Sequence, residues 1–322
     1  MKVAFSKPVG DVCKICGEKG AITEVDTYKS TWFFCGKCKC YSRAQKIKYP
    51  LEDLSSIFLK LFKKIPKING FFSSLSRKKQ GVDFYRYYSE QLETGLRGPW
   101  EGQTRMVEEE LHDAGLLDEW KGKKVLEISG EPGFFAQDLK NEGADVFVSA
   151  FAGDVAEAMH THLGVKTFVY DFNNDDIYKN INSKDKKNSY DFIFIRYSIG
   201  FCENVPRLFH DLSNLLKQNG LLYVSFNPAS RAVLLRWMFD DYTYLRQYTE
   251  SHLNESATHA GLRLHARFDE GFFYWDHGPY SMHWSLRPFA RRYLTKDSFY
   301  SKGSVDDSVQ KRVALMYIKK DG

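Results

Sequence analysis

The sequence predicts an α/β fold in which a parallel sheet carries helices on both faces, preceded by a small cysteine-rich unit. Three observations support this prediction. Short apolar, β-prone runs alternate with helical segments over most of the chain after residue 124. A glycine-containing turn at residues 129–133 separates the first of these runs from a helix. Two Cys-x-x-Cys pairs stand near the N-terminus.

The cysteine pairs have the spacing of a metal site. Eighteen residues separate the two pairs, which consist of Cys13 with Cys16 and Cys35 with Cys38. Two such turns can direct four thiolates at one tetrahedral Zn²⁺, and four thiolates leave no open position, so a structural site is expected. Residues 21–28 and 31–34 predict the hairpin of a zinc ribbon. Disulfides and a redox dithiol are the alternatives; a cytosolic setting disfavours the first and the doubled motif the second.

A basic and aromatic segment follows the cysteines. Between residues 41 and 81, ten lysines and arginines face only Glu52 and Asp53, which indicates contact with anionic material or a solvated basic face. Apolar residues at helical spacing predict an amphipathic helix over residues 51–65. That helix either packs on its own domain or lies on an anionic membrane surface or a partner. Two more helices are expected, one from residue 84 and one over 103–117.

The alternating region starts with a strand at residues 125–128, the turn, and a helix from Phe134. Glycines in the turn let a ligand approach the main chain, and the helix start offers free N–H groups, so the turn suits an anionic or nucleoside-bearing ligand. Further strands are predicted at residues 144–151, 167–170, 190–196, 220–226, 261–267 and 313–318, and further helices at 155–163, 205–217 and 249–260.

Ligands of such sheets bind at the carboxyl ends of the strands. This rule gathers four places around one crevice: residues 129–133, Phe151, Asp171 and residues 196–198.

An aromatic stretch at residues 272–284 lies between the last two predicted strands. His277 and His283, with Asp276 beside the first, are candidate general bases because histidine titrates near neutral pH. The tyrosines and tryptophans around them predict either a stacking wall for a sugar or planar ring, or a core plug.

Composition excludes a membrane-spanning class. The net charge is +5, no apolar run reaches the roughly 18 residues needed to cross a bilayer, and the N-terminal residues lack the apolar core of a signal peptide. A soluble, cytoplasmic protein is expected.

Three stretches resemble the class I S-adenosylmethionine-dependent methyltransferases: VLEISGEPGFFAQDL at 125–139, YDFIFIRYSIGF at 190–201, and LFHDLSNLLKQNGLLYVSF at 208–226. The resemblance implies a Rossmann-like sheet of seven strands in the order 3-2-1-4-5-7-6, with strand seven antiparallel and formed by residues 313–318. It also implies S-adenosyl-L-methionine as cofactor, beside the structural Zn²⁺ of the ribbon. A zinc ribbon before such a domain is similar to the arrangement in sugar C-methyltransferases and some rRNA methyltransferases.

The resemblance also assigns cofactor-binding residues. Glu127 matches the acidic residue of the first motif and Gly133 its last glycine, and Asp171 fits the position that contacts adenine. Ala150 or Phe151 stands where an acidic residue usually binds the ribose, and Asp154 is the nearest carboxylate along the chain. The remaining implied residues are Ser129, Gly130, Phe172, Arg196, Tyr197 and Tyr88.

Ser129 and Glu131 depart from the family pattern, because both stand where glycines are usual. Glu131 is expected to bring a carboxylate near the carboxylate of the cofactor and to repel it.

These expectations combine into three domains and three functional hypotheses. The domains are a zinc ribbon (1–45), a helical linker and lid (46–118), and a methyltransferase domain (119–322) with an aromatic insertion at 272–300. The leading hypothesis is methyl transfer to a small-molecule or glycan-type acceptor, such as a carbohydrate. The alternatives are an rRNA or tRNA methyltransferase, and a catalytically inactive binding protein with the same fold.

Overall fold

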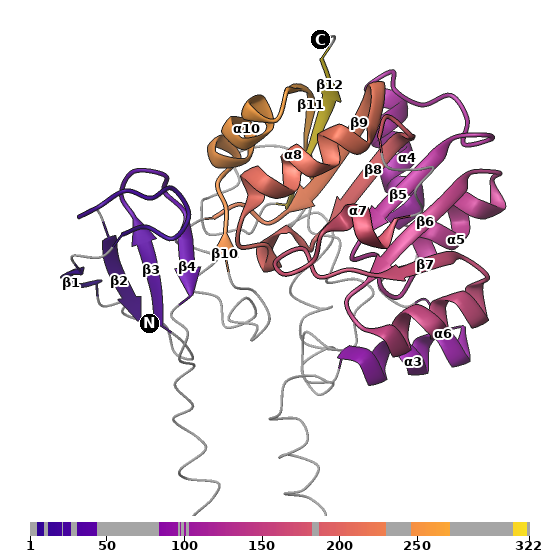
Figure 1. The fold of residues 1–322 in the computed structure, drawn as a ribbon, viewed down its shortest axis with the longest axis horizontal. Coiled ribbons are helices and arrows are strands. Elements are labelled where there is room, and N and C mark those ends of the chain that lie inside the picture. The colour runs from indigo at the N-terminus through magenta and orange to yellow at the C-terminus, as the bar shows by residue number, and fades with distance from the viewer. Residues whose placement is uncertain are drawn as a thin grey trace, which may run out of the picture.

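The structure, a computed structural model, describes residues 5–9, 12–20, 22–26, 31–43, 84–95, 97, 100, 103–181, 187–229, 246–270 and 312–320. These residues form a seven-stranded sheet with helices on both faces and a smaller five-stranded sheet beside it (Figure 1). The predicted helix at 51–65, the basic segment around it and the aromatic stretch at 272–284 lie outside the described residues.

The large sheet has the predicted order and polarity. Its strands run β7-β6-β5-β8-β9-β12-β11, which corresponds to 3-2-1-4-5-7-6. The first five are parallel, whereas β12 is antiparallel to both of its neighbours. Their bounds are β5 (Lys124–Ile128), β6 (Asp145–Ala150), β7 (Lys166–Val169), β8 (Tyr190–Arg196), β9 (Leu216–Phe226), β11 (Leu262–Glu270) and β12 (Arg312–Lys319).

Helices cover both faces of this sheet (Figure 1). Residues of α7 (Ile177–Asn180), α8 (Val205–Leu215) and α10 (Glu250–His259) pack into one core cluster. Residues of α3 (Phe84–Thr94), α4 (Gln103–Asp113), α5 (Phe134–Asn141) and α6 (Gly153–Leu163) pack into the other. The predicted helices are confirmed where the structure describes them, and α7 was missed because it has only four residues. None of the described helices is long and apolar enough to cross a membrane.

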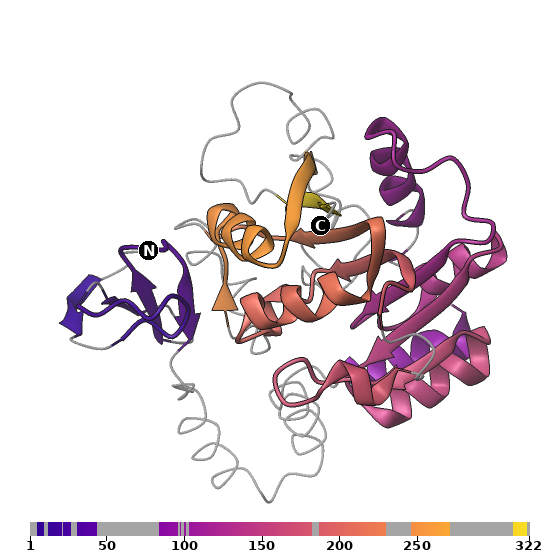
Figure 2. The same cartoon turned by 45° about the horizontal axis from the view of Figure 1, so that its top comes forward.

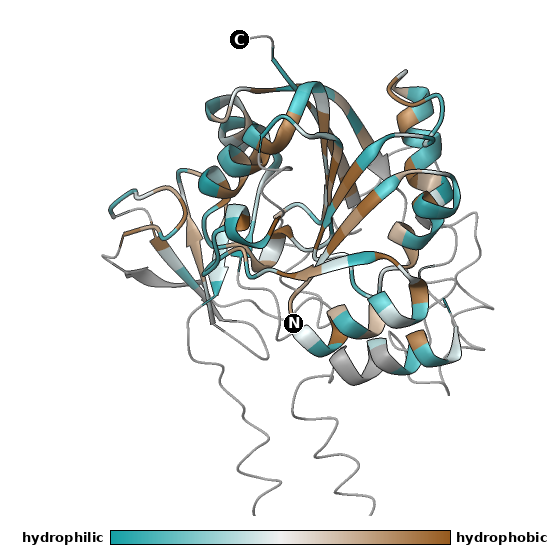
Figure 3. Cartoon of the chain, turned by 45° about the vertical axis from the view of Figure 1, so that its right-hand side comes forward, coloured by the Kyte–Doolittle hydropathy of each residue, from teal (hydrophilic) through white to brown (hydrophobic). Residues whose placement is uncertain are grey.

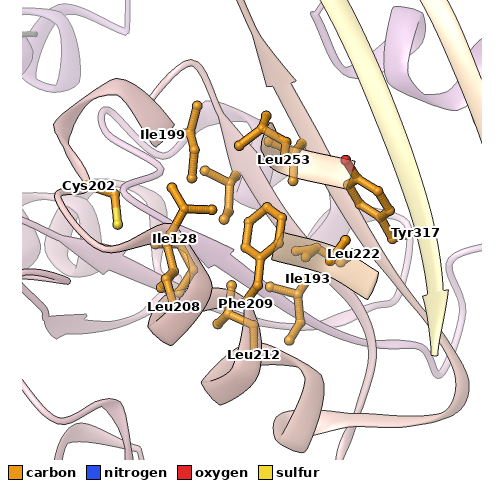
Figure 4. Close-up of a cluster of buried hydrophobic side chains, with 14 of the residues drawn as sticks. Ile128, Ile193, Ile199, Cys202, Leu208, Phe209, Leu212, Leu222, Leu253 and Tyr317 are labelled. Carbon is orange, nitrogen blue, oxygen red and sulfur yellow. The ribbon is translucent and has the colours of Figure 1, made fainter. Parts of the chain in front are cut away.

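Strand β8 shows why the sheet is covered twice. Ile193 and Ile195 point into the first core cluster and Phe192 and Phe194 into the second. A strand that is apolar on both sides is stable only when both faces are buried, which is typical of parallel sheets. Figure 3 shows brown, apolar strands between helices with teal outer faces. Figure 4 shows one cluster, in which Phe209 of α8 lies among apolar side chains from the sheet and from α10.

The smaller sheet confirms the predicted hairpin and adds strands that the sequence did not reveal. Strands β2 (Ile22–Asp26) and β3 (Thr31–Cys35) pair antiparallel. β1 (Phe5–Val9) and β4 (Tyr41–Arg43) flank them. The fifth strand, β10 (Arg246–Gln247), comes from the segment before α10 and pairs antiparallel with β4. A two-residue strand has no periodicity to detect, and its partner lies about 200 residues away in the sequence.

Hydrogen bonds next to β10 join the two sheets, whose arrangement Figure 2 shows from a second direction. Thr249 caps the start of α10, and its hydroxyl donates to the carbonyl of Cys38 at 3.2 Å. The Thr249 N–H donates to the Cys40 thiol at 3.4 Å. The Tyr248 hydroxyl donates to the carbonyl of Cys202 at 2.6 Å. The cysteine-rich unit is therefore fixed to the large sheet through residues 246–249.

Replacing Thr249 with valine tests this junction. The change removes a helix cap and the hydroxyl that bonds to Cys38, so we expect a loss of about 1–2 kcal/mol in the free energy of unfolding. Urea denaturation followed by circular dichroism measures it. Thr258→Val is the matched control, since Thr258 is exposed on the same helix and bonds only within it. Equal losses in the two variants would contradict the role of Thr249.

Candidate functional site

Four segments meet at the carboxyl ends of the parallel strands, as predicted. Residues 129–133 follow β5, Phe151 follows β6, Tyr170 and Asp171 follow β7, and Tyr197 follows β8. Because β5 lies between β6 and β8 in the sheet, the turn after β5 stands at the centre of this group. The order of the strands reverses at this point, which is where ligands of open α/β sheets bind.

The turn after β5 is held against β6. The N–H of Ser129 donates to the Ser149 hydroxyl at 2.9 Å, and the N–H of Gly130 donates to the Ser149 carbonyl at 3.1 Å. Sequence reasoning did not find Ser149, because a single serine in an apolar strand carries no motif. Ser129 has a φ of +50°, a left-handed conformation that is unusual for a residue with a side chain.

Gly130 is needed for packing inside the turn. A Cβ atom at this position would lie 2.4 Å from the Cδ of Glu127 and 2.6 Å from a methyl group of Val148. The main chain therefore lies directly on the Glu127 carboxyl group. Gly133, with a φ of +90°, starts α5 without a side-chain cap, so the first N–H groups of this helix have no side-chain acceptor at the cap.

Glu127 and Arg196 form a buried ion pair at the base of the site. The carboxylate is fully buried, and its Oε1 accepts from Nε and Nη2 of Arg196 at 2.8 and 2.6 Å. The guanidinium also lies 4.0 Å from the centre of the Phe135 ring. Burial raises the pKa of Glu127, and Arg196 opposes that shift. The second oxygen, Oε2, has no hydrogen-bond partner among the described residues.

The Glu131 carboxylate crosses from the turn to the end of β6. Its Oε1 accepts from the N–H of Phe151 at 2.5 Å. Burial raises the pKa of Glu131 to about 7, and hydrogen bonds from the N–H groups of Phe151 and of Glu131 itself offset part of that shift. Repulsion between Glu131 and the cofactor's carboxylate stays a prediction.

Two phenylalanines lie next to Glu131. Phe151 is 36% exposed, and its ring meets the ring of Phe172 edge-on with centroids 5.8 Å apart. Phe172 is buried and also contacts Tyr170. Phe151 therefore offers an aromatic surface to a ligand, while Phe172 supports it from the core.

Asp171 organises the loop after β7. Its carboxylate accepts from the N–H of Asn173 at 2.9 Å and from the side chain of Asn174 at 2.6 Å. The Asn173 side chain in turn donates to the carbonyl of Phe201, in the loop after β8, at 2.8 Å. The loops after β7 and β8 are thus tied together on one side of the site.

The other predicted cofactor residues lie at two places. Tyr197 has a φ of +59°, and its N–H donates to the carbonyl of Ser225 on β9 at 2.9 Å. Tyr88 lies on α3, and its ring is 6.4 Å from that of Trp100. Arg97, which sequence reasoning missed, pairs with Asp138 on α5 at 2.7 Å and so fixes the segment after α3 to the helix that starts at the turn.

The predicted general bases His277 and His283, and their neighbour Asp276, lie outside the described residues. Their roles therefore stay predictions.

The four predicted metal ligands come together. The Sγ atoms of Cys13, Cys16, Cys35 and Cys38 all lie within 4.8 Å of one another, with 3.9 Å between Cys13 and Cys38 and 3.7 Å between Cys16 and Cys35. This compact group of thiols could hold a metal ion. Cys40 and Cys202 are buried and are not among these four, although the Cys40 thiol donates to the carbonyl of Cys38 at 3.4 Å.

The sequence also matches known proteins. Residues 100–267, more than half of the chain, match a family described as a methyltransferase domain. A curated relative, the biotin biosynthesis bifunctional protein BioHC of Cellvibrio japonicus (strain Ueda107), is 28% identical over 145 residues. That alignment covers 44% of this chain and 28% of the relative.

Solved structures with a similar fold include a putative sarcosine dimethylglycine methyltransferase from Galdieria sulphuraria. Its TM-score is 0.49 at 14% identity, over 68% of this chain and 85% of that one. Another is a putative S-adenosylmethionine-dependent methyltransferase from Listeria monocytogenes, with a TM-score of 0.44 at 11% identity, over 67% and 100% of the two chains.

The buried ion pair predicts a large loss of stability when one partner is removed. Arg196→Met leaves the Glu127 carboxylate buried without its counter-ion, and we expect a loss of about 3–5 kcal/mol in urea denaturation. The double variant Glu127→Gln/Arg196→Met should lose less than the sum of the two single variants, because the removed charges interact. Arg97→Met is a control at a partly exposed pair, where about 1 kcal/mol is expected. Additive losses at the buried pair would contradict the coupling.

Proposed function

Because the chain belongs to the methyltransferase domain family, we propose that it transfers a methyl group from S-adenosyl-L-methionine to a small-molecule or glycan-type acceptor. Membership of this family supports methyl transfer as the class of reaction. The choice of cofactor and acceptor is our proposal.

The residues at the carboxyl ends of the strands fit a nucleoside-bearing cofactor. Unpartnered polar atoms remain there among the described residues, namely Oε2 of Glu127 and the hydroxyl of Ser129. The uncapped start of α5 and the exposed ring of Phe151 add main-chain donors and a stacking surface. When bound, the cofactor supplies a methyl group on a sulfonium, which an in-line displacement moves to the acceptor.

Charge at the base of the site supports a cationic cofactor. An unpaired arginine next to a sulfonium would repel it, but Arg196 is neutralised by Glu127 at 2.6 Å. The pair also fixes the position of the Arg196 side chain and so makes this wall of the site rigid. Rigid walls favour methyl transfer because the reaction depends mainly on alignment of donor and acceptor.

The position of the cysteine-rich unit suits contact with the methyl acceptor near the end of β8. Strand β10 extends the small sheet toward η3 (Ile199–Phe201), the short helix after β8. Nη2 of Arg246 on β10 lies 3.6 Å from Oε1 of Glu203, which follows η3. We propose that this unit bounds the acceptor side of the crevice, and that His277 or His283, with Asp276, supplies the base when the acceptor carries a proton.

We further propose that the four cysteines bind Zn²⁺. Four sulfurs placed 2.3 Å from a tetrahedral Zn²⁺ lie about 3.8 Å apart, and the distances of 3.9 and 3.7 Å between Sγ atoms fit that value. With four thiolates the metal has no open position, so its role is structural.

Cofactor binding and transfer test the proposed reaction. Titration calorimetry should show binding of S-adenosylhomocysteine, and cell extract incubated with methyl-labelled S-adenosylmethionine should yield a labelled product of low mass. Nuclease treatment is the control: label that stays with RNA until nuclease is added would support an RNA acceptor instead. Binding without any labelled product would favour the inactive binding protein, and absence of binding would contradict the proposed cofactor.

Metal removal tests the zinc site. Purified protein should contain about one equivalent of zinc by mass spectrometry of metals, and chelation should lower the melting temperature. Cys16→Ala should abolish metal binding, whereas Cys202→Ala, which changes a buried thiol outside the cluster, should keep the metal. Retention of zinc in Cys16→Ala would contradict the proposed ligand set.

A further inference from the structure

The Glu131 carboxylate occupies a distinctive place, between the turn after β5 and the end of β6. We propose that Glu131 binds the ribose hydroxyls of the cofactor and so replaces the acidic residue that strand β6 lacks at its end. This inference rests on the proposed function, because it requires a cofactor that carries a ribose.

The position of the carboxylate supports this role. The residues at the end of β6 are Ala150 and Phe151, and neither has a polar side chain. Glu131 reaches that end from the neighbouring strand, and its Oε1 bonds to the N–H of Phe151 at 2.5 Å. In sheets of this type, a carboxylate near the end of the second strand binds ribose hydroxyls. The carboxylate is therefore at the right end of the right strand, although it comes from a different loop.

The carboxylate also has unused capacity to accept hydrogen bonds. A carboxylate offers about four acceptor sites, and the main-chain N–H groups of Phe151 and Glu131 account for two of them. Burial raises the pKa of Glu131 to about 7 despite these two bonds, as expected for a carboxylate with fewer donors than it can use. A vicinal diol supplies two further donors from one side.

The other carboxylates near the site are less suited to the ribose hydroxyls. Oε2 of Glu127 has no hydrogen-bond partner among the described residues, but the side chain is fully buried. Glu127 is buried beneath Gly130 and paired with Arg196. Asp171 holds the loop after β7 through Asn173 and Asn174. Asp154 is exposed at the start of α6, where its Oδ1 accepts from the N–H of Val155 at 2.9 Å.

Phe151 strengthens the assignment to a nucleoside. Phe151 carries both the exposed ring and the N–H that donates to Glu131. An aromatic surface and an acceptor for hydroxyl groups are therefore close together. A nucleoside presents the matching groups, a planar base that can stack on an aromatic ring and a diol that can donate hydrogen bonds. In this role Glu131 strengthens cofactor binding. The sequence predicted the opposite effect, a weakening by repulsion.

Calorimetric titration of two ligands into the full-length protein tests the proposal. The ligands are S-adenosylhomocysteine and its analogue lacking both ribose hydroxyls. Glu131→Gln should weaken binding of S-adenosylhomocysteine about tenfold to a hundredfold, the effect of losing charge-assisted hydrogen bonds. The same variant should bind the analogue as the unchanged protein does. Asp154→Asn, the matched control, should leave both affinities unchanged.

The outcomes separate this inference from the proposed function. If the unchanged protein fails to bind S-adenosylhomocysteine, both are wrong. If it binds and Glu131→Gln binds equally well or more tightly, only the role of Glu131 is wrong. Equal weakening toward both ligands would assign Glu131 a purely structural role and also overturn the proposal. Should Glu131→Gln not fold, a crystal structure of the unchanged protein with S-adenosylhomocysteine decides, since the proposal requires carboxylate-to-hydroxyl distances below about 3.2 Å.

Discussion

The buried ion pair between Glu127 and Arg196 constrains the whole ligand end of the sheet. Taking two charges out of water costs several kcal/mol per ion unless they meet with good geometry. The two residues lie on the same face of neighbouring strands, because Glu127 aligns with Phe194 and Arg196 follows two positions later. The pair therefore fixes the alignment of β5 and β8. It also requires a glycine above it, since any Cβ at Gly130 would strike the Glu127 carboxyl group.

The path of the turn determines which groups face a ligand. With Gly130 pressed onto Glu127 and bonded to Ser149 on β6, the next side chain, Glu131, is directed toward the end of β6. Its contact with Phe151 then places a carboxylate where the strand itself supplies none. Replacement of a family glycine by Glu131 is therefore consistent with an intact cofactor site, provided that the carboxylate acts on hydroxyl groups rather than on another carboxylate.

The sequence predicted the parts of the fold that follow from local pattern. The alternation of strands and helices predicted a parallel sheet covered on both faces, and the spacing of the two cysteine pairs predicted their cluster. Contacts between distant segments were not predictable in this way. Nothing in the residues around β10 indicates pairing with β4, because strand pairing depends on the three-dimensional position of both partners. The pairing of Glu127 with Arg196 was missed for the same reason.

Contacts at the junction next to β10 link the packing of the small sheet to that of the large sheet. The carbonyl of Cys38, one of the four clustered cysteines, accepts from Thr249, which also caps α10. Helix α10 packs Leu253 into the core beside Phe209 and Ile128 (Figure 4). A continuous series of contacts thus runs from the cysteine cluster to the strand that carries Glu127. Because close-packed interiors have low compressibility and transmit strain, we expect the geometry of the cysteine cluster to influence that of the turn after β5.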